Sequence, residues 1–186
     1  MMVPRNSGRC HGQCGMTLVE QIMVLAIMGI LAGIAVPPLR NLLNHNMLQV
    51  AQTDFIAALQ HARETAVISG KRTLFCPTRD GSRCSGDMRW DNGWLLGHDA
   101  NADDQPDNGP LYTGPGYGGK LIVRSSAGRH VVRFRPDGSA SGSNITLVFC
   151  QLSDPAGALS VFVSNSGRIR GAPATAVQAA ACLQAT

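Results

Sequence analysis

The stretch Gly15-Met16-Thr17-Leu18-Val19-Glu20 leads directly into an apolar run that continues to Val36. It places one carboxylate, that of Glu20, near the start of a segment long enough to span a bilayer as a helix. A charge in lipid is costly, so this residue is expected to be functional and to have a partner. Arg5 and Arg9 precede Gly15 without any acidic residue beside them, which predicts a cytoplasmic N-terminus.

The position of Gly15 separates this segment from an ordinary secretory signal. In a secretory signal the small residue at the cleavage site follows the apolar core, whereas Gly15 precedes it. Cleavage after Gly15 would keep the apolar segment on the mature protein and create a new amine at Met16. That amine could neutralise the Glu20 carboxylate of a neighbouring copy. The alternative is a plain N-terminal anchor with Glu20 at the level of the lipid headgroups, where a lone carboxylate is tolerated.

This arrangement resembles the class III signal of type IV pilins and pseudopilins, which a prepilin peptidase cleaves and N-methylates. The resemblance rests on Gly15, the hydrophobic residue after it, Thr17-Leu18-Val19-Glu20 and the apolar run; Met16 stands where the family usually has Phe. It implies a leader peptide over residues 1–15, processing at Gly15 and Met16, and a role for Glu20 in assembly. It also implies a single pass of the inner membrane, with the C-terminal domain in the periplasm before assembly and on the pilus, outside the cell, afterwards.

The apolar run is followed by a second pattern of helical period. Pro37 and Pro38 remove two amide donors and are expected to kink or locally melt the helix after the hydrophobic segment of residues 16–36. From Leu39 to Ala66, apolar residues recur at steps of three and four. This predicts an amphipathic continuation of the helix over residues 37–70, with Gly70 as its C-cap and an apolar stripe packed on a sheet.

After Gly70 the pattern changes to short apolar runs separated by turn clusters. The predicted strands are residues 72–76, 94–97, 121–124, 131–134, 146–150 and 159–164, with a short return at 168–170. The polar connections favour one antiparallel sheet, so the chain is expected to be α+β, with a β-rich globular domain over residues 71–186. One long helix packed across such a sheet is the architecture of type IV pilins.

The six cysteines divide between the leader and the globular domain. Cys10 and Cys14 fall in the leader, where two thiols and one imidazole on a cleavable tail would make a poor metal site. Four cysteines beyond a membrane anchor imply an oxidising periplasm and two disulfides, with three possible pairings. Local closure favours Cys76–Cys84, leaving Cys150–Cys182 to hold the Ala-rich tail.

No catalytic arrangement emerges from the sequence, and we expect neither an enzyme nor a cofactor or metal site. The acidic run from Asp99 to Asp107 partly resembles a calcium loop. Asp104 and Pro110, however, occupy the positions where an EF-hand needs Gly and Glu. A solvated acidic turn is therefore favoured, with calcium binding left open.

The sharpest local signal is Ser166-Gly167-Arg168-Ile169-Arg170. On a strand that leaves a Gly turn, Arg168 and Arg170 are two residues apart and share one face. They are well placed to meet successive phosphates. The alternative is a solvated hairpin edge, where arginines also discourage aggregation between edges. The surrounding half of the chain is basic, since from Leu111 onward it has seven lysines and arginines against two aspartates.

Together with the N-terminal motif, two further stretches resemble the GspH/FimT family: Phe134-Arg135-Pro136-Asp137-Gly138 and the run from Val161 to Arg168. Within the second, Gly167-Arg168-Ile169-Arg170 matches the GRxR motif of FimT-type minor pilins, which bind DNA during natural transformation. The resemblance implies that Gly167, Arg168 and Arg170 bind double-stranded DNA. Charge alone adds four auxiliary candidates, Arg133, Arg135, Arg124 and Lys120.

The resemblance also implies other pilins in a filament, the prepilin peptidase and the inner membrane as partners. Two other functions remain open at this point. One is a purely structural minor pilin that primes pilus assembly. The other is a GspH-like pseudopilin of a type II secretion system.

Overall fold

The computed structural model describes residues 17–184, except for the side chains of residues 34–45, 155 and 183. The leader, with the predicted processing site at Gly15 and Met16, lies outside the described residues. The chain divides into two compact units, residues 1–42 and residues 43–186. No helical stretch among the described residues combines the length and the apolar content needed to cross a membrane.

The first helix, α1 (Leu18–Ser69), belongs to both units. Thr17 begins it as an N-cap, because the backbone N–H of Glu20 donates to Thr17 Oγ1 over 3.3 Å. The helix continues through Pro37 and Pro38, so the expected local melting does not occur. It ends at the predicted Gly70, whose φ of 62° suits a glycine C-cap.

Eight strands follow α1 in two antiparallel sheets, where the sequence predicted one. The first sheet has the order β3-β2-β1-β5 and the second the order β4-β6-β7-β8. The strands of the first sheet are β1 (Thr73–Pro77), β2 (Trp94–His98), β3 (Tyr112–Gly114) and β5 (Val132–Phe134). Those of the second sheet are β4 (Ile122–Ser125), β6 (Ile145–Gln151), β7 (Asp154–Val163) and β8 (Ile169–Pro173).

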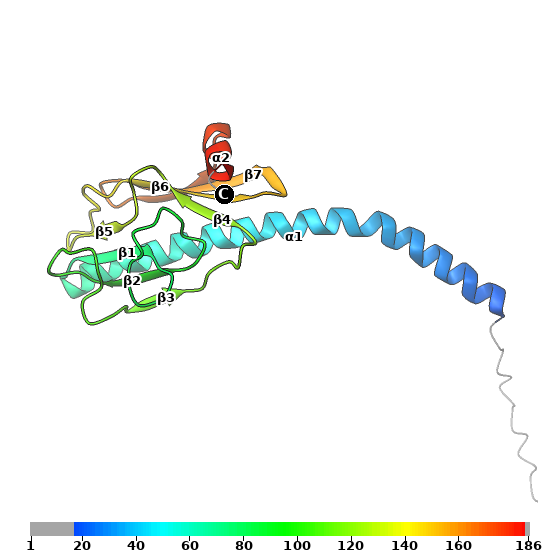
Figure 1. The fold of residues 1–186 in the computed structure, drawn as a ribbon, viewed down its shortest axis with the longest axis horizontal. Coiled ribbons are helices and arrows are strands. Elements are labelled where there is room, and N and C mark those ends of the chain that lie inside the picture. Colours follow the sequence, from blue (N-terminus) through cyan, green and yellow to red (C-terminus); the bar gives the residue numbers. More distant parts are fainter. Residues whose placement is uncertain (1–16, 185–186) are drawn as a thin grey trace, which may run out of the picture. The chain divides into compact units, whose positions relative to one another are not determined.

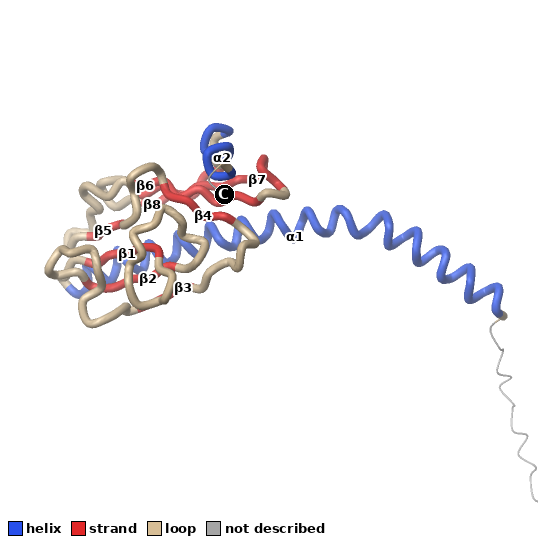
Figure 2. The backbone as a smooth tube through the Cα atoms, viewed as in Figure 1, coloured by secondary structure: helices blue, strands red, loops and turns tan. Residues whose placement is uncertain are grey.

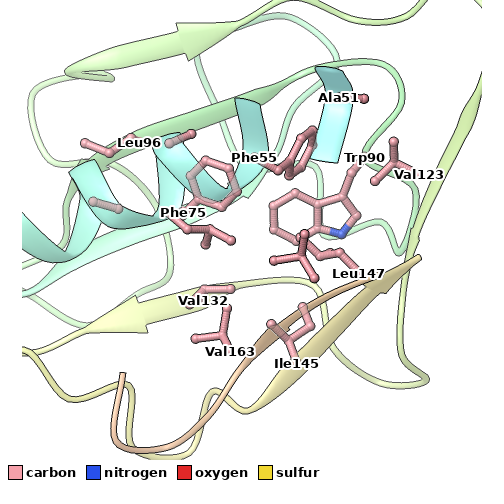
Figure 3. Close-up of a cluster of buried hydrophobic side chains, with 14 of the residues drawn as sticks. Ala51, Phe55, Phe75, Trp90, Leu96, Val123, Val132, Ile145, Leu147 and Val163 are labelled. Atoms are coloured by element: carbon pink, nitrogen blue, oxygen red, sulfur yellow. The ribbon is translucent and has the colours of Figure 1, made fainter. Parts of the chain in front are cut away.

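Both sheets pack against the C-terminal half of α1, so one core joins all three (Figures 1 and 2). Phe55 of α1 lies at its centre and meets Phe75 and Phe149 edge to face, with ring centroids 5.9 and 5.1 Å apart. Figure 3 shows Phe55 beside the indole of Trp90, which is fully buried. Aromatic rings from α1 and from both sheets therefore meet in this core.

The opposite face of the second sheet carries a short helix, α2 (Ala176–Leu183), which the sequence did not predict. Thr175 caps it in a capping box with Gln178. The structure contains the disulfides Cys76–Cys84 and Cys150–Cys182, and the second one ties α2 to β6. The tail is therefore a packed element and not a loose end.

Residues 43–186 carry the whole described core. Every buried hydrophobic side chain of the described residues lies between Leu48 and Cys182, and both disulfides lie in the same span. A fragment of residues 43–186 thus keeps all the packing of the globular unit and suits solution experiments.

Candidate nucleic-acid interface

Arg168 and Arg170 flank Ile169 at the start of β8, and both are exposed. Ile169 turns the other way and packs against the main core. The preceding turn is closed by backbone hydrogen bonds, with Gly167 N–H donating to the Ser164 carbonyl over 2.8 Å and Ser164 N–H donating to the Arg168 carbonyl over 3.0 Å. The alternation expected of a strand therefore places both guanidiniums on the same outer face.

These two arginines form one wall of an open groove of about 780 Å³ on the second sheet. Its floor includes Thr146 of β6 and Phe162 of β7, which are cross-strand partners, and Phe162 in turn pairs with Arg170. The opposite wall is the connection between β4 and β5, which contributes Arg129. Three arginines from segments about 40 residues apart in the chain thus meet around one groove.

Arg129 is the residue that sequence reasoning missed. It was counted in the basic half of the chain, but no motif distinguishes it from its neighbours. Its side chain is half-buried and its Nη1 donates to the Gly142 carbonyl over 3.0 Å. What identifies Arg129 is the pairing of β4 with β6. This pairing brings the end of β4, and the loop after it that carries Arg129, beside the groove.

The three arginines keep their charge unneutralised by protein acids. Within residues 17–184, neither Arg129, Arg168 nor Arg170 forms an ion pair. Guanidinium groups in this state offer planar donor pairs that match phosphate oxygens. The groove therefore presents a positively charged surface whose three arginines have no acidic partner in the described part of the chain.

The auxiliary candidates lie in different places. Arg124 of β4 is half-buried and lines a smaller pocket of about 260 Å³ beneath α2, which shares Ser126, Ala127 and Thr146 with the groove. Lys120 and Arg135 are exposed but do not line either pocket. Of the four, only Arg124 lines a pocket that shares residues with the groove.

Arg133 lies on β5 of the first sheet and has an acidic partner. Its guanidinium pairs with the Asp104 carboxylate, and Arg72 contacts the same carboxylate at 3.0 Å. The hydrogen bond from Arg133 lowers the pKa of Asp104 below its ordinary value, and the same bond raises the pKa of Arg133. The charge of Arg133 is thus neutralised by Asp104 within the protein, and Arg133 does not line the groove.

The same cluster includes two residues of the acidic run, Asp99 and Asp104. Asp99 is fully buried and its carboxylate lies 2.9 Å from Arg72, so the expectation of a wholly solvated turn was wrong at this residue. Among the described residues, no group of three or more His, Cys, Asp or Glu side chains could hold a metal ion.

Two family models match the chain. The model described as type II transport protein GspH covers residues 51–167, more than half of the chain. The model described as the prokaryotic N-terminal methylation motif covers residues 10–36, which include Gly15 and Glu20. No significant match was found among curated proteins.

Solved structures give the same fold. The type IV minor pilin FimU of Pseudomonas aeruginosa superposes in two crystal forms, with TM-scores of 0.58 and 0.56, each at 24% identity. The matches cover 69% and 68% of this chain and 90% and 93% of FimU. The minor pseudopilin EpsH of the Vibrio cholerae type 2 secretion system matches at a TM-score of 0.48 and 14% identity, covering 68% of this chain and 96% of EpsH.

The methylation motif and the pilin neighbours indicate an N-terminally anchored pilin. Because the GspH model covers most of the globular unit and the methylation model covers the start of the chain, this protein belongs to the GspH family of type IV pilin-like proteins.

Proposed function

We propose that this chain is a minor type IV pilin that binds double-stranded DNA through the groove of Arg129, Arg168 and Arg170 and serves DNA uptake in natural transformation. The observation that carries the proposal is the meeting of these three unpaired arginines around one groove. The contacts would be to phosphates, so binding would be largely independent of sequence.

The N-terminal part of the chain would place this groove on a filament. A prepilin peptidase would cleave after Gly15 and methylate Met16, while residues 16–36 would hold the subunit in the inner membrane with its N-terminus in the cytoplasm. In the filament the Glu20 carboxylate would pair with the new amine of a neighbouring subunit. Retraction of the pilus would then draw bound DNA toward the periplasm.

The test is a titration of labelled duplex DNA with the fragment of residues 43–186, followed by fluorescence anisotropy at low salt. We expect weak, salt-sensitive binding by the wild type, weaker binding by Arg168→Ala and by Arg170→Ala, and almost none by the double variant. Arg79→Ala is the matched control, since Arg79 is an exposed arginine that pairs with Asp87 and lies outside the groove. Equal binding by the wild type and the double variant would show that the DNA site lies elsewhere on the protein.

The family match supports a second function, that of a GspH-like pseudopilin in a type II secretion system. A purely structural minor pilin that primes assembly is the third. Both would be favoured by a wild-type fragment that does not bind DNA at low salt. Neighbouring genes distinguish the two, because pilin genes would accompany one and a secretion operon the other.

A further inference from the structure

The turn that carries Arg168 is packed against a second turn, which the proposed DNA contact leaves without a role. This second turn follows β5 and contains the Phe134–Gly138 motif. Gly138 N–H donates to the Arg135 carbonyl over 2.8 Å, and Ser139 N–H donates to the Asp137 side chain over 2.8 Å. The motif therefore builds a closed and well-defined turn, from which the chain continues toward β6.

Two glycines form the contact between the turns. Gly138 and Gly167 are both buried, and each has a φ of 77°. A Cβ on Gly167 would overlap the carbonyl oxygen of Gly138. The turn of Arg168 thus sits on the backbone of the other turn with no room for a side chain between them.

Arg63 of helix α1 contacts both turns where they meet. Arg63 Nε donates to the Gly138 carbonyl over 2.8 Å. A Cβ on either Gly138 or Gly167 would lie 3.2 Å from the same Nε, so the guanidinium covers both glycines. A single side chain of α1 therefore touches both turns at the point where they meet.

The chain after the second turn also reaches the opposite wall of the groove. Ala140 N–H donates to the Asn165 carbonyl over 2.9 Å, and Gly142 N–H donates to the Asn165 side chain over 3.2 Å. The Gly142 carbonyl in turn accepts the bond from Arg129. Residues 138–142 thus connect the wall of Arg168 with the wall of Arg129.

We propose that Arg63 and the turn of residues 135–138 are positioning elements of the DNA site, holding the Gly167 turn so that Arg168 and Arg170 face the groove opposite Arg129. This inference rests on the proposed function. Long arginine side chains lose conformational freedom when they bind, and a fixed backbone beneath them reduces that cost. Arg63 itself acts through Gly138 and not on the phosphate.

The first test leaves every charge in place. Gly167→Ala puts a methyl group against the Gly138 carbonyl, and Gly86→Ala is its matched control, since Gly86 has a φ of 71° but open space around its Cα. We expect Gly167→Ala to weaken binding of duplex DNA by about tenfold, through loss of one or two phosphate contacts, and Gly86→Ala to bind as the wild type. Both fragments are checked for folding by circular dichroism.

The second test uses Arg63 and remains valid if Gly167→Ala does not fold. Arg63→Gln should weaken binding and shift the amide NMR signals of residues 164–168 in the free protein, and Arg63→Lys should restore part of both. Arg83→Gln, an exposed arginine of the first disulfide loop, controls for the loss of one charge.

The outcomes separate this inference from the proposed function. If the wild-type fragment does not bind DNA, both the proposed function and this inference are rejected. Normal binding by Gly167→Ala and Arg63→Gln leaves the DNA site intact and overturns the positioning role. Weaker binding by Arg63→Gln with unchanged amide signals at residues 164–168 also overturns it, because Arg63 would then contact DNA directly.

Discussion

Arg133 and Arg168 carry the same guanidinium, but their surroundings give them different uses. The Arg133 side chain is 28% exposed and pairs with Asp104, which ties the first sheet to the acidic loop. Arg168 is exposed on the second sheet and has no ion pair in the described part of the chain. The number of arginines in this half of the chain therefore overstates the charge available to a polyanion.

Arg129 offers the most direct test of the groove at the level of a single residue. Arg129→Ala should weaken binding of duplex DNA by roughly 1 kcal/mol, about fivefold in Kd, and reduce the slope of log K against log salt by about one. Arg133→Ala should leave that slope unchanged, because its charge is already paired. A slope that responds to Arg133 and not to Arg129 would place the DNA on the first sheet.

The Asp104 cluster predicts a pH dependence of stability. The folded-state pKa of Asp104 lies below its ordinary value of 3.8, so its contribution is present above that pH and is lost as the pH falls through the lower folded value. Asp104→Asn should therefore cost about 1–3 kcal/mol at pH 7. The difference from the wild type should shrink below about pH 4. Urea unfolding of both proteins at pH 7 and pH 3 measures this, and a difference that stays constant with pH would exclude the ion pair as its source.

Among the elements, α2 depends most on a covalent link. It is eight residues long, which is too short for a stable helix by itself, and it packs on the outer face of the second sheet through Val148, Ala158 and the Cys150–Cys182 disulfide. The Cys76–Cys84 disulfide instead closes a short loop after β1. The two bridges therefore differ both in loop length and in what they hold.

This difference predicts unequal costs of removal. The bridges join residues 32 and 8 positions apart. In the chain-entropy model Cys150–Cys182 contributes about 4 kcal/mol and Cys76–Cys84 about 2.5 kcal/mol. Replacing Cys150 and Cys182 with Ala should also speed hydrogen exchange in residues 176–183, whereas replacing Cys76 and Cys84 should not. Denaturant unfolding and exchange measurements on both variants check the order, and equal exchange of α2 in both would show that packing alone holds it.

Over the whole molecule, α1 has two separate roles. Its residues from Leu48 onward form the centre of the described core, while its described residues from Leu18 to Gly33 are exposed. Large apolar side chains lie in this exposed stretch, such as Leu25, 69% exposed, and Leu31, 59% exposed. Under the proposed function the inner membrane, and then other subunits of a filament, would cover them.

Processing is the prediction that belongs to this scale. Mass spectrometry of the protein extracted from membranes should show a chain that begins at N-methylated Met16. Glu20→Ala should reduce incorporation into filaments while leaving membrane insertion intact, because it removes the partner of the new amine. Cells that lack the prepilin peptidase provide the control. An unprocessed N-terminus in cells that contain the active peptidase would contradict the prediction.

The sequence by itself determined the features that depend on neighbouring residues. These are the long first helix with its apolar stripe, the approximate positions of every strand except β3, the Gly turn before Arg168 and the antiparallel character of the β-rich domain. Each follows from local periodicity or turn chemistry, because both depend only on residues that are close together in the sequence. The disulfide pairing favoured by local closure is also the one that the structure contains.

Only the tertiary structure decided how the strands are grouped into sheets and which charged side chains are paired. It divided the strands into two sheets, both of which pack against the one apolar stripe of the C-terminal half of α1. It paired Arg133 with Asp104 and left Arg129 beside Arg168 and Arg170, because strand pairing brings distant segments to one edge. Whether a charge is neutralised or available depends on such long-range neighbours, and a linear pattern does not contain them.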